Sequence, residues 1–272
     1  MHRKRSVNVL AIFTLACSLS IGLMACLDKG DQGPAGPTGP TGSEGPGGAA
    51  NVTVMGEISL DSTTASTGRV HVWVSNAPSV STVTVNGTSI PLTGFAGTAW
   101  AYFLEQVSIS AGATANLVVS YSRADGSTGT AQASVTLPGT FLMVSPPDGV
   151  TDVAIPNGSG LAVSWTPSAG VTRYSVQMEW DLDYYDSGAT QTKYFDNSRE
   201  LLITDTSVGF TAAVFWPSDF FSAIQGYGEL HVAAVAGPVS EGQPGNVTGD
   251  GSGFFVGVTR AVESIELRHQ SP

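Results

Sequence analysis

The side chains that could carry out chemistry are few and scattered along the chain. Of four histidines, three follow the N-terminal apolar segment: His71 in VHVWV, His231 in LHVAAV, and His269 near the C-terminus. His71 and His231 alternate with apolar residues, which places each on the polar face of a strand. Neither has a cysteine, an aspartate or a second histidine at metal-ligand or catalytic spacing. We interpret both as solvated strand residues and expect His269 to lie near a mobile C-terminal tail.

Sequence motifs of hydrolases, metalloproteases and nucleotide-binding enzymes are absent from the chain. It contains no Gly-x-Ser-x-Gly elbow, no His-Glu-x-x-His and no phosphate-binding loop. Serine, histidine and aspartate are present, but no spacing among them favours a catalytic triad. The sequence therefore predicts that the protein is not an enzyme.

Two acidic segments offer the oxygen ligands that Ca²⁺ prefers. The first, which we expect to be a turn between two strands, contains three carboxylates: Asp181, Asp183 and Asp186. The second contains Asn246 and Asp250 and begins like an EF-hand loop, but its twelfth position is Gly257, which cannot supply the bidentate carboxylate. We favour polar turns without metal for both segments and keep Ca²⁺ as the alternative, so we expect no firm metal site.

The same segments could instead contact a macromolecular partner. Tyr184 and Tyr185 lie within the first, and we expect both to be exposed, as interface aromatics are. Residues 237–251 contain the second and are predicted to form a long projecting loop, where sandwich domains commonly bind. A planar row of aromatics would favour carbohydrate binding, and its candidates are Trp73, Trp100 and Trp180, although core packing is the simpler role for each.

Composition limits the class of partner. The chain of 272 residues has a net charge of −11, with 42% hydrophobic and only 12% charged residues. Its length suggests about two domains, and its richness in glycine, proline and β-branched residues favours many short strands. An acidic chain repels phosphate backbones, so we expect no nucleic-acid partner. Binding to an anionic membrane would require a covalent anchor.

The N-terminus has the pattern of a secretory signal, with basic MHRKR followed by an apolar run to residue 25. Residues 23–26, Leu-Met-Ala-Cys, resemble the lipobox of bacterial lipoproteins. The resemblance implies cleavage after residue 25 and a covalent lipid on Cys26; beyond this lipid we expect no cofactor. Leu27, in place of aspartate, implies the outer membrane or cell surface of a bacterium. An uncleaved transmembrane anchor is the alternative.

Residues 30–48, GDQGPAGPTGPTGSEGPGG, carry glycine at every third position. This period resembles collagen, where only glycine fits at the axis of three wound chains. The run contains six complete triplets, and proline never occupies the third position of a triplet. We therefore interpret residues 26–50 as a lipidated cysteine plus an extended stalk, with a homotrimer as the alternative.

Residues 51–138 alternate apolar and polar residues in short runs separated by turns. An Asn-Gly pair at 86–87 predicts a two-residue hairpin turn. The runs predict an immunoglobulin-like antiparallel sandwich, with a small barrel as the second choice. The strands are predicted at 52–60, 69–77, 81–92, 98–109, 115–123 and 130–138.

Residues 139–272 contain segments that resemble a fibronectin type III domain. Residues 160–180 resemble its B and C strands, 229–238 its F strand and 252–260 its G strand, while 264–269 is an added edge or tail. Two features depart from the family. Leu230 lies nearest the corner where members often carry tyrosine, and residues 216–228 are predicted to contain a short helix.

Together these observations predict an all-β protein with two tandem antiparallel sandwiches after a signal peptide and a collagen-like stalk. The function that this organisation favours is non-catalytic: a membrane-anchored surface lipoprotein that presents its sandwiches for adhesion, binding or envelope structure. Its partners would be the lipid bilayer and an unidentified protein or glycan. The alternative is a carbohydrate-binding or accessory module of a secreted enzyme system.

Overall fold

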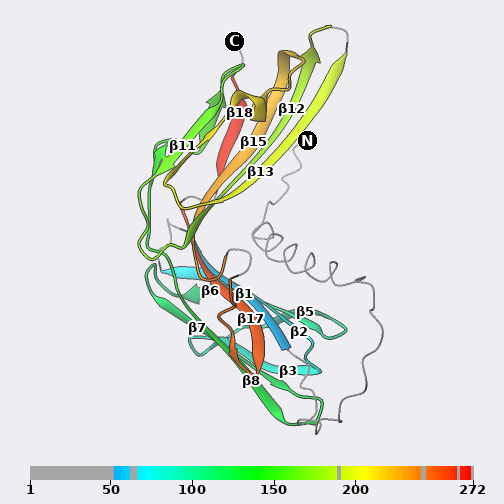
Figure 1. The fold of residues 1–272 in the computed structure, drawn as a ribbon, viewed down its shortest axis with the longest axis vertical. Helices are drawn as coiled ribbons and strands as arrows, with labels where there is room; N and C mark the ends of the chain where they lie inside the picture. The colour runs from blue at the N-terminus through cyan, green and yellow to red at the C-terminus, as the bar shows by residue number, and fades with distance from the viewer. Residues whose placement is uncertain (1–51, 62–65, 189–190, 240–242, 262–263, 271–272) are drawn as a thin grey trace, which may run out of the picture.

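The protein is all-β in its computed structural model, which describes residues 52–61, 66–188, 191–239, 243–261 and 264–270. Strands account for 66% of the described residues. The predicted signal peptide, the Cys26 lipidation site and the collagen-like stalk lie outside the described residues. No described helix is long and apolar enough to cross a bilayer. Two β-rich units lie end to end (Figure 1).

The first unit packs two sheets face to face around a core rich in valine. One layer belongs to a 10-stranded sheet that continues into the second unit, and the other is a 5-stranded sheet in the order β16-β8-β7-β3-β4. The six predicted runs correspond to β1 (Val52–Asp61), β2 (Thr67–Ser75), β3 (Ser79–Val85) with β4 (Thr88–Ser89), β6 (Ala99–Ser108), β7 (Thr114–Ser122) and β8 (Thr128–Thr136). The short strand β5 (Leu92–Ala96) was not predicted.

The predicted hairpin turn between β3 and β4 is confirmed. Asn86 and Gly87 both have positive φ, 48° and 79°, as a two-residue turn between twisted strands requires. The Asn86 side chain also accepts a hydrogen bond from the backbone N–H of Asn116 on β7, at 2.9 Å. The turn residue therefore ties its own hairpin to the neighbouring strand.

The second unit packs a 3-stranded sheet, β14-β11-β9, against the other part of the long sheet. Its core is aromatic and includes Trp165, Tyr174, Trp180 and Phe215. The elements are β9 (Met143–Ser145), β10 (Asp152–Ile155), β11 (Leu161–Trp165), β12 (Arg173–Asp186), β13 (Thr192–Ile203), β14 (Ser207–Phe210), α2 (Ala212–Phe215), β15 (Phe220–Ala236) and β18 (Ile265–His269).

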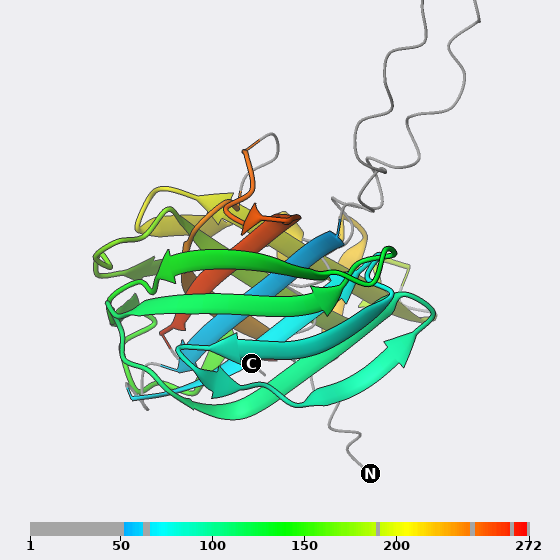
Figure 2. The same ribbon diagram turned by 90° about the horizontal axis from the view of Figure 1, so that it is seen from below.

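One strand joins the two units. β17 (Gly251–Arg260), preceded by the short β16 (Thr248–Gly249), pairs in parallel with β1 along its whole length. Its last four residues also pair with residues 233–236 of β15, which belongs to the second unit. Figures 1 and 2 show β17 beside β1 in both views. The segment predicted to be the last strand of the second sandwich thus also completes the first, and Phe255 is buried in the first core.

The helix predicted within residues 216–228 is wrong. β15 begins at Phe220, and the only helical turn nearby is the four-residue α2. Tertiary pairing explains the difference, because residues 220–236 are paired with β12 along most of their length. Gly226 permits a close approach, since a Cβ there would lie 2.7 Å from the Trp180 ring. Glycine therefore serves strand packing at this position rather than ending a helix.

Candidate functional site

The outer face of the long sheet in the second unit carries two of the acidic residues singled out in the sequence, Asp181 and Asp183. Along β12, Trp180, Leu182 and Tyr184 are buried in the core, while the residues between them point outward. Residues directly opposite on neighbouring strands share a face. The register of β12 with β13 and β15 therefore identifies every residue beside Asp181 and Asp183 on this outer face.

Asp181 and Asp183 are each flanked by exposed tyrosine or amide side chains. Asp181 lies opposite Tyr227 on β15, and Asp183 lies opposite Tyr194 on β13 and Gln225 on β15. The Tyr194 hydroxyl donates a hydrogen bond to Asp181 Oδ1 at 2.5 Å, and Gln225 Nε2 donates to Asp183 Oδ2 at 2.8 Å. Tyr194 is 61% exposed and Tyr227 57%. Their rings are available to a ligand that also contacts the carboxylates.

The hydrogen bond to Asp181 alters the chemistry of Tyr194. It raises the pKa of the Tyr194 hydroxyl, because removing the proton would leave two anions in contact; partial burial and the nearby Asp196 act in the same direction. Tyr194 is therefore a neutral hydrogen-bond donor rather than a base or nucleophile.

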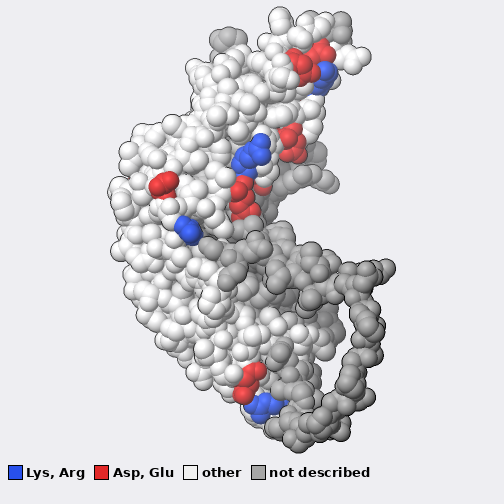
Figure 3. All heavy atoms as spheres, in the orientation of Figure 1, with Lys and Arg blue, Asp and Glu red and all other residues white. Residues whose placement is uncertain are grey.

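A row of carboxylates crosses the same face. Glu179 on β12 lies opposite Glu229 on β15, Glu229 lies opposite Glu266 on β18, and Glu266 lies opposite Asp152 on β10. Charged side chains are few on the face of the molecule seen in Figure 3, which is mostly uncharged. The outer face of the second unit is therefore an acidic surface with exposed tyrosines. We call it the acidic face; its members are Asp152, Glu179, Asp181, Asp183, Tyr194, Asp196, Gln225, Tyr227, Glu229 and Glu266, with one basic residue, Arg268, opposite Tyr227.

The first predicted loop is a strand, so its residues separate onto two sides. Asp181 and Asp183 belong to the acidic face, whereas Asp186 pairs with Lys193, at 3.1 Å. Tyr184 is 4% exposed and donates its hydroxyl to Asp219, so the prediction that it is exposed is wrong. Tyr185 is exposed, at 42%.

Lys193 and the buried Tyr184 both contact the carboxylate of Asp219. Its ammonium group lies 2.6 Å from Asp219 Oδ2 as well as 3.1 Å from Asp186. Hydrogen bonds to these two carboxylates raise the pKa of Lys193, and the same contact lowers the pKa of Asp219. The single ammonium group therefore offsets part of the negative charge of the two carboxylates at the end of the sheet.

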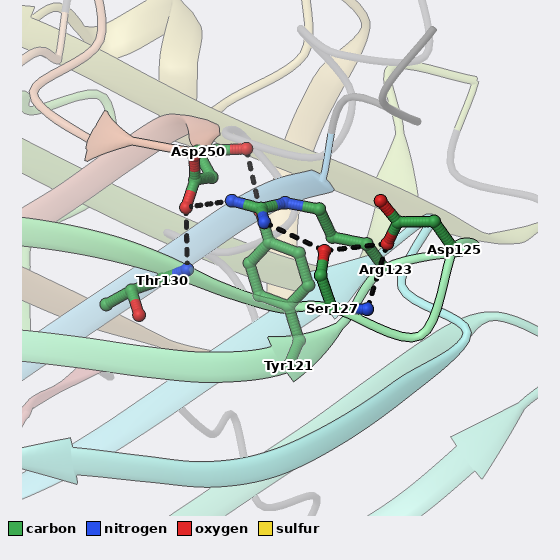
Figure 4. Close-up of polar contacts among 6 residues, drawn as sticks. All are labelled: Tyr121, Arg123, Asp125, Ser127, Thr130 and Asp250. Atoms are coloured by element: carbon green, nitrogen blue, oxygen red, sulfur yellow. Dashed lines mark hydrogen bonds and ion pairs between the residues drawn. The ribbon is translucent and has the colours of Figure 1, made fainter. Parts of the chain in front are cut away.

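Asn246 and Asp250 have protein partners that hold the long loop against the first unit. Asn246 Oδ1 accepts from Phe255 N at 2.7 Å, and its Nδ2 donates to Phe255 O at 2.8 Å. Asp250 Oδ2 lies 2.6 Å from Arg123 and accepts from Thr130 N at 3.0 Å (Figure 4). The Thr130 hydrogen bond and the Arg123 contact lower the pKa of Asp250. Both residues fix the loop to β8 and β17.

No group of three histidine, cysteine or acidic side chains within the described ranges is arranged to hold a metal ion. An open crevice of about 500 Å³ lies beside the junction of the units, between β8, the end of β15 and the loop before β16. The residues that line it include Thr172, Gly237 and Asn246, and none of the lining side chains titrates near neutral pH. Its lining residues supply hydroxyl and amide groups but no carboxylate, imidazole, ammonium or thiol group.

The three candidate tryptophans do not form a row. Trp180 is buried and donates its Nε1–H to Phe215 O at 2.9 Å, which confirms a core role. Trp100 packs against the first core and stacks on the exposed Phe95, with ring centroids 5.5 Å apart. Trp73 is 39% exposed and lies on the other face of that sheet, beside Ala101.

The histidines are less solvated than predicted. His71 is half-buried, with its ring centroid 4.3 Å from that of Phe103, and burial is the main reason its pKa is lowered. His231 is also half-buried, and its Nε2 lies 3.2 Å from Glu229 Oε2. His269 is not in a tail but ends β18, where Nε2 lies 2.9 Å from Asn157 Oδ1.

Sequence reasoning missed Tyr194, Asp196 and Tyr227 as neighbours of Asp181. The alternation of β12 was visible, but its partner strands were not assigned. No protein-family model matches the chain, and no curated protein is significantly similar to it. Any inference about the function of this chain therefore rests on its own sequence and structure.

Proposed function

We propose that the chain is a non-catalytic, lipid-anchored bacterial surface protein that binds a partner through the acidic face of its second unit. One observation carries the proposal: Tyr194 and Tyr227 stand exposed beside the Asp181 carboxylate on an open sheet face. Exposed aromatics next to polar groups are typical of binding surfaces. The residues around them are held by hydrogen bonds across strands, so the surface is preorganised for contact.

The chain path supports presentation of this face away from an anchor. β1 starts at Val52, which pairs with Gly251, and ends near the residues of β17 that pair with β15. The chain therefore enters the first unit at the end remote from the second unit (Figure 1). A stalk of residues 30–48 in extended form would add roughly 60 Å. A lipid on Cys26 would then leave the acidic face furthest from the membrane.

The two units fit tandem sandwiches of immunoglobulin and fibronectin type III type. Each has its own hydrophobic core between two sheets. β11 and β12 follow one another at the positions expected for B and C, and β15 contains the segment compared with F. The shared strand β17 is the departure, because it pairs with β1 as well as with β15.

Glycan binding is the second candidate function. The exposed rings of Tyr194 and Tyr227 favour it, since sugar rings stack on aromatic faces and sugar hydroxyls donate to carboxylates. The tryptophans give this candidate no support, because they lie on different faces.

The test uses the full chain expressed in a bacterial host. Fatty-acid labelling and fractionation should place the wild type in the membrane, and C26S should abolish both the label and the membrane location. Protease added to intact cells should cut the second unit. Membrane retention of C26S without label, or complete protection of the second unit in intact cells, would contradict the proposal. A C17S variant is the matched control and should behave as wild type.

A further inference from the structure

The row of carboxylates on the acidic face is unfavourable for the isolated chain. Four acids from four adjacent strands, Glu179, Glu229, Glu266 and Asp152, lie directly opposite one another. Like charges in that relationship destabilise a sheet. Folding alone gives no reason to keep the row, since uncharged polar residues at these positions would pack without repulsion.

Basic side chains contact two of the four acids in the row. Arg268 Nε lies 2.5 Å from Asp152 Oδ1, and His231 contacts Glu229. In the part of the chain that the structure describes, the side chains of Glu179 and Glu266 make no hydrogen bond or ion pair. Their charge is available to a molecule outside this chain.

The geometry suits an extended cationic ligand rather than a single ion. Adjacent strands lie about 4.8 Å apart, so the four acids are spread over roughly 14 Å. That spacing agrees with the finding that no three acids among the described residues converge to hold a metal. A flexible chain with several ammonium or guanidinium groups can contact the whole row.

The tyrosines beside the row add a second kind of contact for the same ligand. Tyr227 lies opposite Asp181 on one side, and Tyr194 donates to Asp181 from the other strand. A guanidinium or ammonium group placed here would meet a carboxylate and aromatic faces together. Cations bind favourably over aromatic rings, and arginine also pairs with carboxylates in two-pronged fashion.

From this arrangement we propose that the acidic face is a docking surface for a lysine- and arginine-rich polypeptide segment. The inference rests on the proposed function, which makes this face the binding surface, and it specifies the partner's chemistry. Charge complementarity selects a cationic polypeptide over a neutral glycan, because a neutral glycan brings no positive charge to offset the repulsion in the row.

The experiment measures binding of fluorescent decalysine to the full chain in detergent micelles, with decaglutamate as the negative probe. Decalysine should bind and decaglutamate should not. The variant E179Q/E229Q/E266Q should weaken decalysine binding by about 10-fold or more, since three of the four charges of the row are removed. The control E105Q/D148N/D205N removes the same number of exposed charges elsewhere and should change affinity by less than about 3-fold.

Three results would overturn the inference. The first is equal weakening in both triple variants, which would mean that decalysine responds only to net charge. The second is decalysine binding that persists unchanged in E179Q/E229Q/E266Q. The third is no decalysine binding together with neutral-glycan binding that Y194A/Y227A abolishes, which would leave the proposed binding role of this face intact. The membrane and protease tests above decide the proposed function separately.

Discussion

The Glu57 carboxylate lies 3.6 Å from the Arg260 guanidinium inside the sheet that joins the two units. Glu57 is 1% exposed, and its oxygens accept no hydrogen bond from the described residues. His71 lies directly opposite it on β2, and Arg260 lies opposite Ala233 of β15. Glu57 is therefore a buried acid with one ion-pair contact, next to the strand shared by both units. Desolvation opposes the ionisation of its carboxyl group.

Glu57 should make the protein less stable as pH rises. Burial raises the pKa of Glu57 above its ordinary value of 4.5, and the opposing pull of Arg260 is smaller. The folded state then holds this proton at pH values where the unfolded chain has lost it, so unfolding free energy falls as pH increases above about 4.5. Urea unfolding between pH 4 and 8 should show that fall in the wild type, and E57Q should lack this component.

The control for this pH experiment is E105Q, which changes an exposed glutamate of β6 and should reproduce the wild-type pH dependence. His71 contributes in the opposite sense, because its pKa is lowered by burial and by Arg260 and Arg69. Because His71 is present in both proteins, the difference in pH dependence between wild type and E57Q isolates the contribution of Glu57. Parallel stability curves for wild type and E57Q would show that Glu57 has the same pKa in both states.

Tyr121 connects β7 to the long loop before β17. It is buried, and its hydroxyl donates to Asp250 O at 2.7 Å (Figure 4). Y121F removes that hydrogen bond and should lower the unfolding free energy by about 0.5–1.5 kcal/mol in chemical denaturation. Y102F is the control, because Tyr102 is buried but its hydroxyl has no hydrogen bond within the described ranges, and it should have a smaller effect. Equal effects of the two changes would exclude a role for this contact.

The sequence carried enough information for the strands of the first unit. Small apolar residues alternate with more polar ones in much of β2, β3 and β8, and the Asn86-Gly87 pair fixes one turn, so local pattern and structure agree. β13 was missed because it is an edge strand with charged residues and little alternation of apolar side chains. Its composition resembles a loop, and only its pairing with β12 defines it as a strand.

The position of β17 could not be read from local pattern. Its alternation identified a strand, but pairing in parallel with β1 brings together residues almost 200 positions apart. The acidic face escaped prediction for the same reason. Asp181 and Asp183 could be identified from the sequence as candidate ligand residues. Tyr194 and Tyr227 are their neighbours only because of the registers in which β13 and β15 pair with β12.

Trp180 should be the most important of the three candidate tryptophans for stability. It is buried, hydrogen-bonded to Phe215 O, and packed edge-on against Phe215 and Trp216. W180A should cost about 3–5 kcal/mol, because it leaves a large cavity and removes the ring contacts. W73A alters a partly exposed ring and should cost about 1 kcal/mol or less. Similar losses in thermal or denaturant unfolding would contradict the assigned core role of Trp180.

The glycine repeat at residues 30–48 should act as a spacer rather than as a trimerisation element. Its six complete triplets lack proline at the third position, and two of them lack proline altogether. Such a short run gives three chains few contacts to offset the loss of chain entropy. Sedimentation in detergent should therefore give a monomer for the full chain and for a variant that lacks residues 30–48. A trimer for the full chain and a monomer for the deletion would show a working triple helix, whereas trimers for both would place the assembly contacts outside the repeat.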